Sequence, residues 1–144
     1  MDAARAASLS ERLRESGLRA TRPRLAVLAL LEELGGHHSA DELVELLVGR
    51  GLRLPRASVY GVLSAIADAG LIQRADVGPG RAVYELATTP HHHFVCTSCG
   101  QIQDVPAGRR APLQAEFPEV EGQIVEARIL FRGSCRQCLP VRKH

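Results

Sequence analysis

The sequence predicts an α+β fold in which a winged-helix domain precedes a small α/β domain. Three observations lead to this prediction. Four amphipathic segments, each ending at glycine, fill most of the region before residue 71. Two short β-prone runs then flank Gly78-Pro79-Gly80. After Leu86 the pattern changes to strand-like alternation and paired cysteines. We therefore divide the chain into residues 1–86 and 87–144, with a hinge near 82–90.

The first two predicted helices have clear start and stop signals. Ser8-Leu9-Ser10-Glu11 is a capping-box pattern, so a short helix is expected to begin there and to end at Gly17. Thr21 opens the second helix, because the proline at position 23 is tolerated in a first turn. Apolar residues at helical spacing continue this helix to Gly35-Gly36.

The third and fourth predicted helices form a helix-turn-helix candidate. The third begins at the capping box Ser39-Ala40-Asp41-Glu42 and ends at Gly51, and the fourth runs from Pro55 to Gly70. Their expected buried residues are Leu43, Val44, Leu46, Leu47, Val59, Val62, Leu63 and Ile66. The fourth helix would then be the one that reads DNA.

A hairpin follows the helices. Residues 71–74 and 82–86 are expected to be its strands, and together with the glycine-rich turn they resemble the wing of a winged helix. Arg74 and Arg81 on this wing would lie near the backbone of a duplex.

The C-terminal domain is predicted to contain strands at 92–96, 101–105 and 124–132 and a short helix at 112–117. In the last strand Val125, Ala127, Ile129 and Phe131 share one face, which we expect to be buried. A domain with so few apolar residues can form only a weak core. We therefore expect it to need a metal and a second copy of the chain.

Composition and charge set limits on function. The chain is 45% hydrophobic and 24% charged, as in globular proteins, and its net charge is only +2. Arginines cluster at 12–24 and 50–56 while acidic residues gather at 32–45, so a DNA-binding face and ordinary solvated helix surfaces are both compatible with the pattern. With 3% aromatic residues and no Trp, the chain lacks a platform for stacking single-stranded bases.

Neither a membrane segment nor a signal peptide is expected. The longest apolar run, Leu25–Leu31, is much shorter than the roughly 20 residues that a bilayer requires. No apolar stretch follows the charged N-terminus. We therefore expect a cytoplasmic protein, and in a reducing compartment paired cysteines bind metal more often than they form disulfides.

Two Cys-x-x-Cys pairs predict a structural zinc site. The four cysteines are Cys96, Cys99, Cys135 and Cys138. Two such turns supply the four thiolates of a closed tetrahedral shell, and the long interval between them suits a site that attaches the last segment of the chain to a sheet. A redox-active dithiol or four unrelated cysteines are the alternatives.

A second cluster of metal ligands precedes the first cysteine pair. On a strand His91 and His93 would point to one side and His92 to the other. Asp104 on the next strand would add a carboxylate, which gives a nitrogen and oxygen donor set suited to Fe(II), Mn(II), Ni(II) or Zn(II). A solvated surface run is the alternative interpretation of three consecutive histidines.

The chain resembles the ferric uptake regulator family of metal-dependent dimeric repressors. The motifs that carry the resemblance occur in the family's order: Gly17-Leu18-Arg19-Ala20-Thr21-Arg22-Pro23-Arg24, His37-His38-Ser39-Ala40-Asp41-Glu42-Leu43, Ala57-Ser58-Val59-Tyr60, His91-His92-His93-Phe94-Val95-Cys96-Thr97-Ser98-Cys99-Gly100 and Gly133-Ser134-Cys135-Arg136-Gln137-Cys138. The resemblance implies an N-terminal winged-helix DNA-binding domain, a small α/β dimerisation domain and double-stranded operator DNA as partner.

The resemblance also assigns a regulatory metal site. Its ligands would be His37, Glu85, His91, His93 and Asp104. The exposed beginning of the fourth helix gives Arg56, Ser58 and Tyr60 as base-reading residues, and Arg19, Arg22 and Arg24 as phosphate anchors. Polar capping near a helix start and an ordinary surface strand position are the alternatives for His37 and Glu85.

Three departures from the family pattern limit what can be transferred. Glu126-Ala127-Arg128 stands where many relatives have a histidine, so an additional metal site is not expected. Gly61 stands where relatives often have Arg or Asn after the tyrosine, so operator preference cannot be transferred. All four cysteines are used by the structural site, which makes zinc sensing less favoured.

Asp104 favours one sensed signal over others. Peroxide sensors of the family tend to have Asp at this carboxylate, so we expect an Fe²⁺-loaded, peroxide-responsive repressor with structural Zn²⁺, in which His37 and His91 are oxidised. Iron-level or nickel-level sensing is the alternative, with Mn²⁺, Ni²⁺ or Zn²⁺ as substitutes for iron. A non-haem oxygenase would need a deep pocket that this domain is too small to provide, so we expect no enzyme and no organic substrate. A zinc-stabilised protein-interaction module remains a third class.

Overall fold

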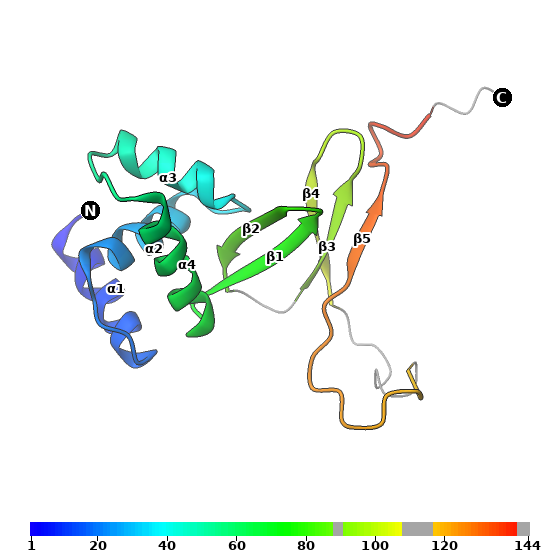
Figure 1. The fold of residues 1–144 in the computed structure, drawn as a ribbon, viewed down its shortest axis with the longest axis horizontal. Coiled ribbons are helices and arrows are strands. Elements are labelled where there is room, and N and C mark those ends of the chain that lie inside the picture. Colours follow the sequence, from blue (N-terminus) through cyan, green and yellow to red (C-terminus); the bar gives the residue numbers. More distant parts are fainter. Residues whose placement is uncertain (88–90, 108–116, 141–144) are drawn as a thin grey trace. The chain divides into compact units, whose positions relative to one another are not determined.

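The computed structural model describes residues 1–87, 91–107 and 117–140 (Figure 1). The chain divides into two compact units, unit 1 over residues 1–88 and unit 2 over residues 89–144. Unit 1 contains four helices and a hairpin, and unit 2 contains a three-stranded sheet. The α+β class and the winged-helix arrangement are as predicted. Within the described ranges, no helix combines the length and the apolar character that crossing a membrane would require.

Helix α1 (Ala3–Glu15) begins six residues earlier than the Ser8 capping box predicts. Asp2 is the actual N-cap, and its carboxylate accepts a hydrogen bond from the Arg5 N–H at 2.8 Å. The alanines between Asp2 and Ser8 have high helix propensity, so nothing stops the helix from extending back to the earlier cap. The expected end near Gly17 is correct, since this residue adopts a φ of 78°.

Helix α2 (Arg22–Leu34) follows Thr21 and ends at Gly35, as predicted. Helix α3 (Ala40–Gly49) begins after Ser39, whose hydroxyl accepts a hydrogen bond from the Glu42 N–H at 3.2 Å. Helix α4 (Arg56–Asp68) follows Pro55 and ends before Gly70. The predicted boundaries of these three helices are therefore correct to within two residues.

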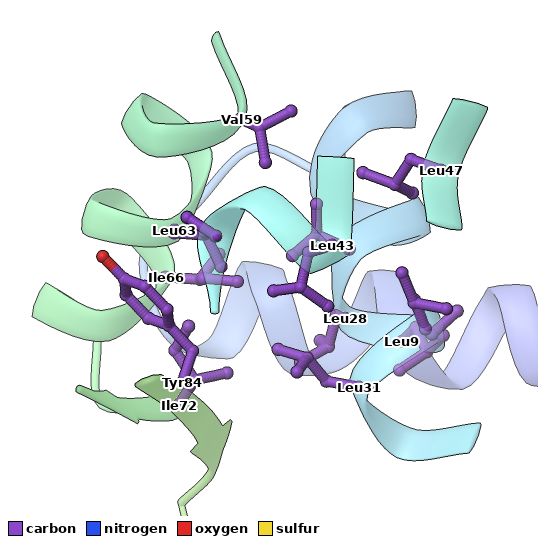
Figure 2. Packing of buried hydrophobic residues seen from close by; sticks show 14 of the residues in the cluster. Leu9, Leu28, Leu31, Leu43, Leu47, Val59, Leu63, Ile66, Ile72 and Tyr84 are labelled. Atoms are coloured by element: carbon purple, nitrogen blue, oxygen red, sulfur yellow. The ribbon is translucent and has the colours of Figure 1, made fainter. Parts of the chain in front are cut away.

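The core of unit 1 is aliphatic and is shared by all four helices. Leu9, Leu28, Leu43, Leu63 and Ile66 are almost completely buried. Figure 2 shows their side chains converging with Ile72 and Tyr84 of the hairpin. Burial of aliphatic surface of this kind is the main stabilising term in a small domain. Val44, Leu46 and Val62, which were expected in the core, are only partly buried and pack at its edge.

Strands β1 (Ile72–Gly78) and β2 (Arg81–Leu86) form the predicted antiparallel wing, and β1 is longer than expected. A short bridge adds a third segment to this hairpin, because His38 and Tyr84 exchange backbone hydrogen bonds of 3.0 and 2.8 Å. The segment before α3 is thereby fixed beside β2. Residues 82–86 of the predicted hinge belong to β2, and residues 88–90 lie outside the described ranges.

Unit 2 is built on strands β3 (His91–Cys96), β4 (Ile102–Pro106) and β5 (Leu130–Gly133). Strand β3 is central, antiparallel to β4 and parallel to β5 (Figure 1). The first two strands agree with prediction. Residues 112–116 of the predicted helix lie outside the described part of the chain.

The predicted strand over 124–132 is wrong in its extent and in its buried face. Only its end is strand, because β5 pairs with residues 93–96 of β3 and the segment before Leu130 has no ladder partner there. Val125 is 88% exposed and Phe131 is 41% exposed, so the expected apolar face is open in the single chain. Among the described residues of unit 2, only Val95 and Cys96 are buried.

Candidate functional site

Four cysteines of unit 2 come together from two turns. Cys96 ends β3 and Cys99 lies in the turn that follows, which Gly100 completes with a φ of 75°. Cys135 and Cys138 follow β5, whose parallel pairing places Gly133 opposite Cys96. The parallel ladder between β3 and β5 is thus what brings the two Cys-x-x-Cys segments side by side.

The sulfur geometry of this cluster fits tetrahedral zinc. The four Sγ atoms all lie within 4.8 Å of one another, and those of Cys99 and Cys135 are 3.8 Å apart. Zinc–sulfur bonds of about 2.3 Å in a tetrahedron place neighbouring sulfurs about 3.8 Å apart. All four cysteines are free thiols, so none is engaged in a disulfide.

The cluster stabilises the ionised form of the Cys96 thiol and disfavours ionisation of the Cys138 thiol. The Cys135 backbone N–H donates to Cys96 Sγ at 3.3 Å, and this bond, with help from the Cys99 N–H, lowers the pKa of the Cys96 thiol to about 6. Hydrogen bonds with Cys135, Cys99 and Cys96 instead raise the pKa of Cys138 to about 12. Adjacent negative sulfurs repel one another, so a divalent cation is needed before all four can ionise.

The second ligand group in unit 2 contains two histidines and an aspartate. His91 and His93 lie on the same face of β3 with ring centroids 4.8 Å apart, whereas His92 faces Phe131 on the other side. Asp104 is the cross-strand partner of His93 on β4. Its Oδ1 lies 3.5 Å from His91 Nε2 and 3.9 Å from His93 Nε2. Ligand bonds of about 2.1 Å allow two donors of one ion to be up to about 4.2 Å apart, so these three side chains fit a single cation.

A histidine and a glutamate form the corresponding pair in unit 1. His37 Nε2 lies 2.9 Å from Glu85 Oε2, and Glu85 is the only buried charged residue among those described. The backbone bridge between His38 and Tyr84 explains this contact, because each partner of the pair is the chain neighbour of a bridged residue. Burying a carboxylate is costly unless it is paired with a cation or hydrogen-bond donors, so this position suits a metal ligand.

Two of the predicted base-reading residues share a carboxylate that the sequence did not indicate. On α4, Arg56 forms an ion pair with Asp41 of α3, and the Tyr60 hydroxyl donates to Asp41 Oδ1 at 3.1 Å. The hydrogen bond from Arg56 holds the pKa of the Asp41 carboxyl below its ordinary range. Ser58, the third reading residue, is exposed on the same helix. No sequence signal identifies Asp41, since the contact depends on how α3 packs against α4.

The predicted phosphate anchors lie at the beginning of α2. Arg22 and Arg24 are in its first turn and Arg19 is in the preceding connector, where its carbonyl accepts a hydrogen bond from Arg24. In the ranges that the structure describes, none of these three arginines makes an ion pair. Several other arginines do make ion pairs.

Basic and acidic residues that form separate clusters along the sequence contact one another in the folded chain. Arg12 and Arg5 pair with Glu32, and Arg50 makes a bidentate pair with Glu33 at 2.7 and 2.8 Å. On the wing, Arg74 pairs with Asp76 at 2.9 Å. Acidic residues at 32–41 therefore neutralise several of the arginines, whereas Arg19, Arg22 and Arg24 keep their charge unpaired within the described ranges.

Comparison with known proteins adds family evidence to this geometry. The model of the ferric uptake regulator family matches residues 15–131. A ferric uptake regulation protein from Neisseria gonorrhoeae is 36% identical over 129 residues, which cover 88% of this chain and 90% of that protein.

Solved structures agree with this result. The crystal structure of the Vibrio cholerae ferric uptake regulator aligns with a TM-score of 0.72 at 32% identity, covering 88% of this chain and 98% of that one. The structure of the ferric uptake regulator from Francisella tularensis with iron aligns with a TM-score of 0.70 at 28% identity, covering 85% of this chain and 95% of that one.

Proposed function

The chain belongs to the ferric uptake regulator family and is a metal-dependent transcriptional regulator rather than an enzyme, and from this premise we propose that it is an iron-loaded dimeric repressor that responds to peroxide. The observation that carries the proposal is that nitrogen and oxygen metal ligands lie close together within each of the two units. His37 and Glu85 face each other in unit 1, and His91, His93 and Asp104 face each other in unit 2. We place its action in the cytoplasm, where operator DNA is accessible.

The four-cysteine cluster has a structural role in this proposal. A complete thiolate shell leaves no open position on Zn²⁺ for a substrate, and the second cysteine pair ties the end of β5 to the turn after β3. Zinc there compensates for the small core of unit 2.

The regulatory ion would take ligands from both ligand groups. An ion that binds all five side chains more tightly in one relative orientation of the units shifts the population toward that orientation. DNA binding by a dimer depends on such an orientation, because two reading helices must enter major grooves about 34 Å apart. A 100-fold gain in operator affinity would correspond to about 2.7 kcal/mol of coupling.

A metal-binding experiment tests whether the two groups share one ion. His37→Ala in unit 1 and His91→Ala in unit 2 are each expected to abolish the labile iron while one zinc per chain remains, as measured by elemental analysis after anaerobic loading. His92→Gln is the control, because His92 lies on the same strand but faces the other way. Retention of a full equivalent of iron by the His37→Ala variant would contradict a shared site.

The partner surfaces are assigned on charge and exposure. Arg56, Ser58 and Tyr60 are exposed at the start of α4, and the unpaired arginines at the start of α2 suit phosphates. In unit 2 the exposed Val125 and Phe131 are an apolar surface that a second copy would cover. Metal-titrated binding to a duplex selected from a random pool, with size measurement of the complex, tests both assignments.

The peroxide response rests on Asp104, the carboxylate that peroxide sensors of this family tend to have. Fe(II), when bound, supplies the electrons that cleave peroxide. His37 and His91 hold the imidazoles that we expect to gain an oxygen atom, which would weaken their binding to metal and end repression. Mass spectrometry of peptides that contain these histidines, after treatment with Fe(II) and peroxide, is the test. Absence of added oxygen on both would exclude a peroxide response by this route.

Iron-level sensing is the second candidate, and the relatives favour it. The matched protein from Neisseria gonorrhoeae is a ferric uptake regulation protein, and the Francisella tularensis regulator is described with iron. An iron-level sensor would release DNA when iron is removed, and peroxide would leave its histidines unmodified. The same mass spectrometry experiment therefore separates the two candidates, and replacement of iron by nickel in the DNA-binding assay tests nickel sensing.

A further inference from the structure

Asp41 lies outside the proposed reading helix, yet it contacts two of the three reading residues. Its Oδ1 accepts a hydrogen bond from the Tyr60 hydroxyl at 3.1 Å, and its carboxylate pairs with the Arg56 guanidinium. Arg56 and Tyr60 are four residues apart on α4 and therefore lie on the same side of the helix. One anion from the neighbouring helix thus holds both side chains.

The anion itself is held in place by α3. Asp41 is in the first turn of this helix, directly after the buried Ala40, and Leu43 and Leu47 anchor the helix in the core. A free arginine side chain has many rotamers and loses much of this freedom when its planar fork docks on a base edge. A carboxylate on a packed helix removes part of that freedom before DNA is bound, so less is lost on binding.

The same carboxylate also lines a cavity that α3 and α4 share with the wing. Asp41 and Tyr60 line a cavity of about 740 Å³ together with Arg74 and Arg81 of the wing. Asp76 lines the same cavity, so two aspartates face two arginines there, and Asp41 is already paired with Arg56; the lining therefore presents no net negative charge to a phosphate. Phosphate contacts are the same for every sequence, so any effect of Asp41 on them changes specific and non-specific affinity alike, and a change in the ratio of the two affinities reports the positioning of Arg56 and Tyr60.

We propose that Asp41 is a specificity-determining positioning residue that presents Arg56 and Tyr60 to base edges. The proposal rests on the DNA-binding function proposed for α4. It predicts that the Asp41 carboxylate increases the ratio of specific to non-specific affinity.

The test uses the metal-loaded full chain and two duplexes, one enriched from a random pool by the wild-type protein and one of scrambled sequence. Asp41→Asn is expected to lower the ratio of the two affinities about tenfold, the scale of one base contact. It should also relax base preference at the same operator position as Arg56→Ala does. Glu45→Gln is the matched control, since it removes the same charge from an exposed position of α3. Its affinity ratio should stay within about twofold of wild type, because it touches no reading residue.

Equal affinity ratios for Asp41→Asn and Glu45→Gln would overturn the proposal, as would a higher ratio for Asp41→Asn than for wild type. In an Arg56→Ala background, Asp41→Asn should produce no further loss of preference at that operator position. An additive loss there would show that Asp41 does not act through Arg56. Failure of the wild type to enrich any sequence would instead refute sequence-specific DNA binding by this protein, which separates the two failures.

Discussion

At the scale of single residues, Gly61 lowers the stability of α4, and no neighbouring atom requires a glycine at this position. It lies in the interior of α4 on the exposed side, and a Cβ placed there meets no atom within 4 Å. Glycine in a helix interior costs conformational entropy. Gly61→Ala is therefore expected to raise the free energy of unfolding by about 0.5–1 kcal/mol, measured by urea denaturation.

Gly35 is the control for this prediction. A Cβ at Gly35 also meets nothing within 4 Å, but the residue has a φ of 62° and ends α2. Gly35→Ala should therefore destabilise the protein by about 1–3 kcal/mol, because its φ of 62° with a ψ of −176° is a backbone conformation that essentially only glycine adopts. A loss of stability in both variants would contradict the role assigned to Gly61.

The Asp41–Arg56 pair gives a second prediction at this scale. Because the hydrogen bond from Arg56 lowers the pKa of Asp41 in the folded state, the pair stabilises the fold at pH values above the ordinary carboxyl pKa of 3.8. This stabilisation is lost as the pH falls through the lowered pKa. In an NMR titration the Asp41 carboxyl carbon should have a midpoint below 3.8, and Arg56→Gln should move the midpoint up toward that value. An unchanged midpoint in the variant would show that another group holds the carboxylate.

At the scale of elements, helix ends differ in how strongly their caps act. Ser39 accepts a hydrogen bond from the Glu42 N–H at the start of α3, whereas Thr21 makes no such bond at the start of α2. Ser39→Ala is expected to cost about 1 kcal/mol of stability and Thr21→Ala clearly less. Thermal denaturation of the two variants measures the difference, and equal losses would contradict the assignment of Ser39 as the active cap.

Local signals explain which elements were predictable from sequence. The boundaries of α2, α3 and α4 follow from a proline, a serine cap and glycines, all of which act within one turn of the helix end. The start of α1 is not predictable from caps alone, because Asp2 and Ser8 are both acceptable caps and the alanines between them decide in favour of Asp2. Strand β5 was overextended because alternation along 124–132 does not reveal how many residues β3 can pair with.

Across the whole chain, the metal ligands are easier to predict from sequence than the contacts between distant segments. The cysteine pairs and the histidines of β3 are adjacent in the chain, so their spacing alone indicates metal binding. The pairing of His37 with Glu85 needs the bridge between His38 and Tyr84, and the role of Asp41 needs the packing of two helices. These contacts join residues far apart in sequence, and no pattern within a single segment encodes them.

The two units also differ in what holds them together, which leads to a prediction about zinc. Unit 1 has an extensive aliphatic core, while the described part of unit 2 buries only Val95 and Cys96. Structural zinc in finger peptides contributes about 10–16 kcal/mol of apparent folding free energy. Removal of zinc by a strong chelator should therefore abolish hydrogen-exchange protection in β3, β4 and β5 and leave the helices of unit 1 protected. A Cys138→Ser variant should reproduce the effect without chelator. If the strands of unit 2 stay protected after elemental analysis confirms zinc loss, the metal is not what stabilises this unit.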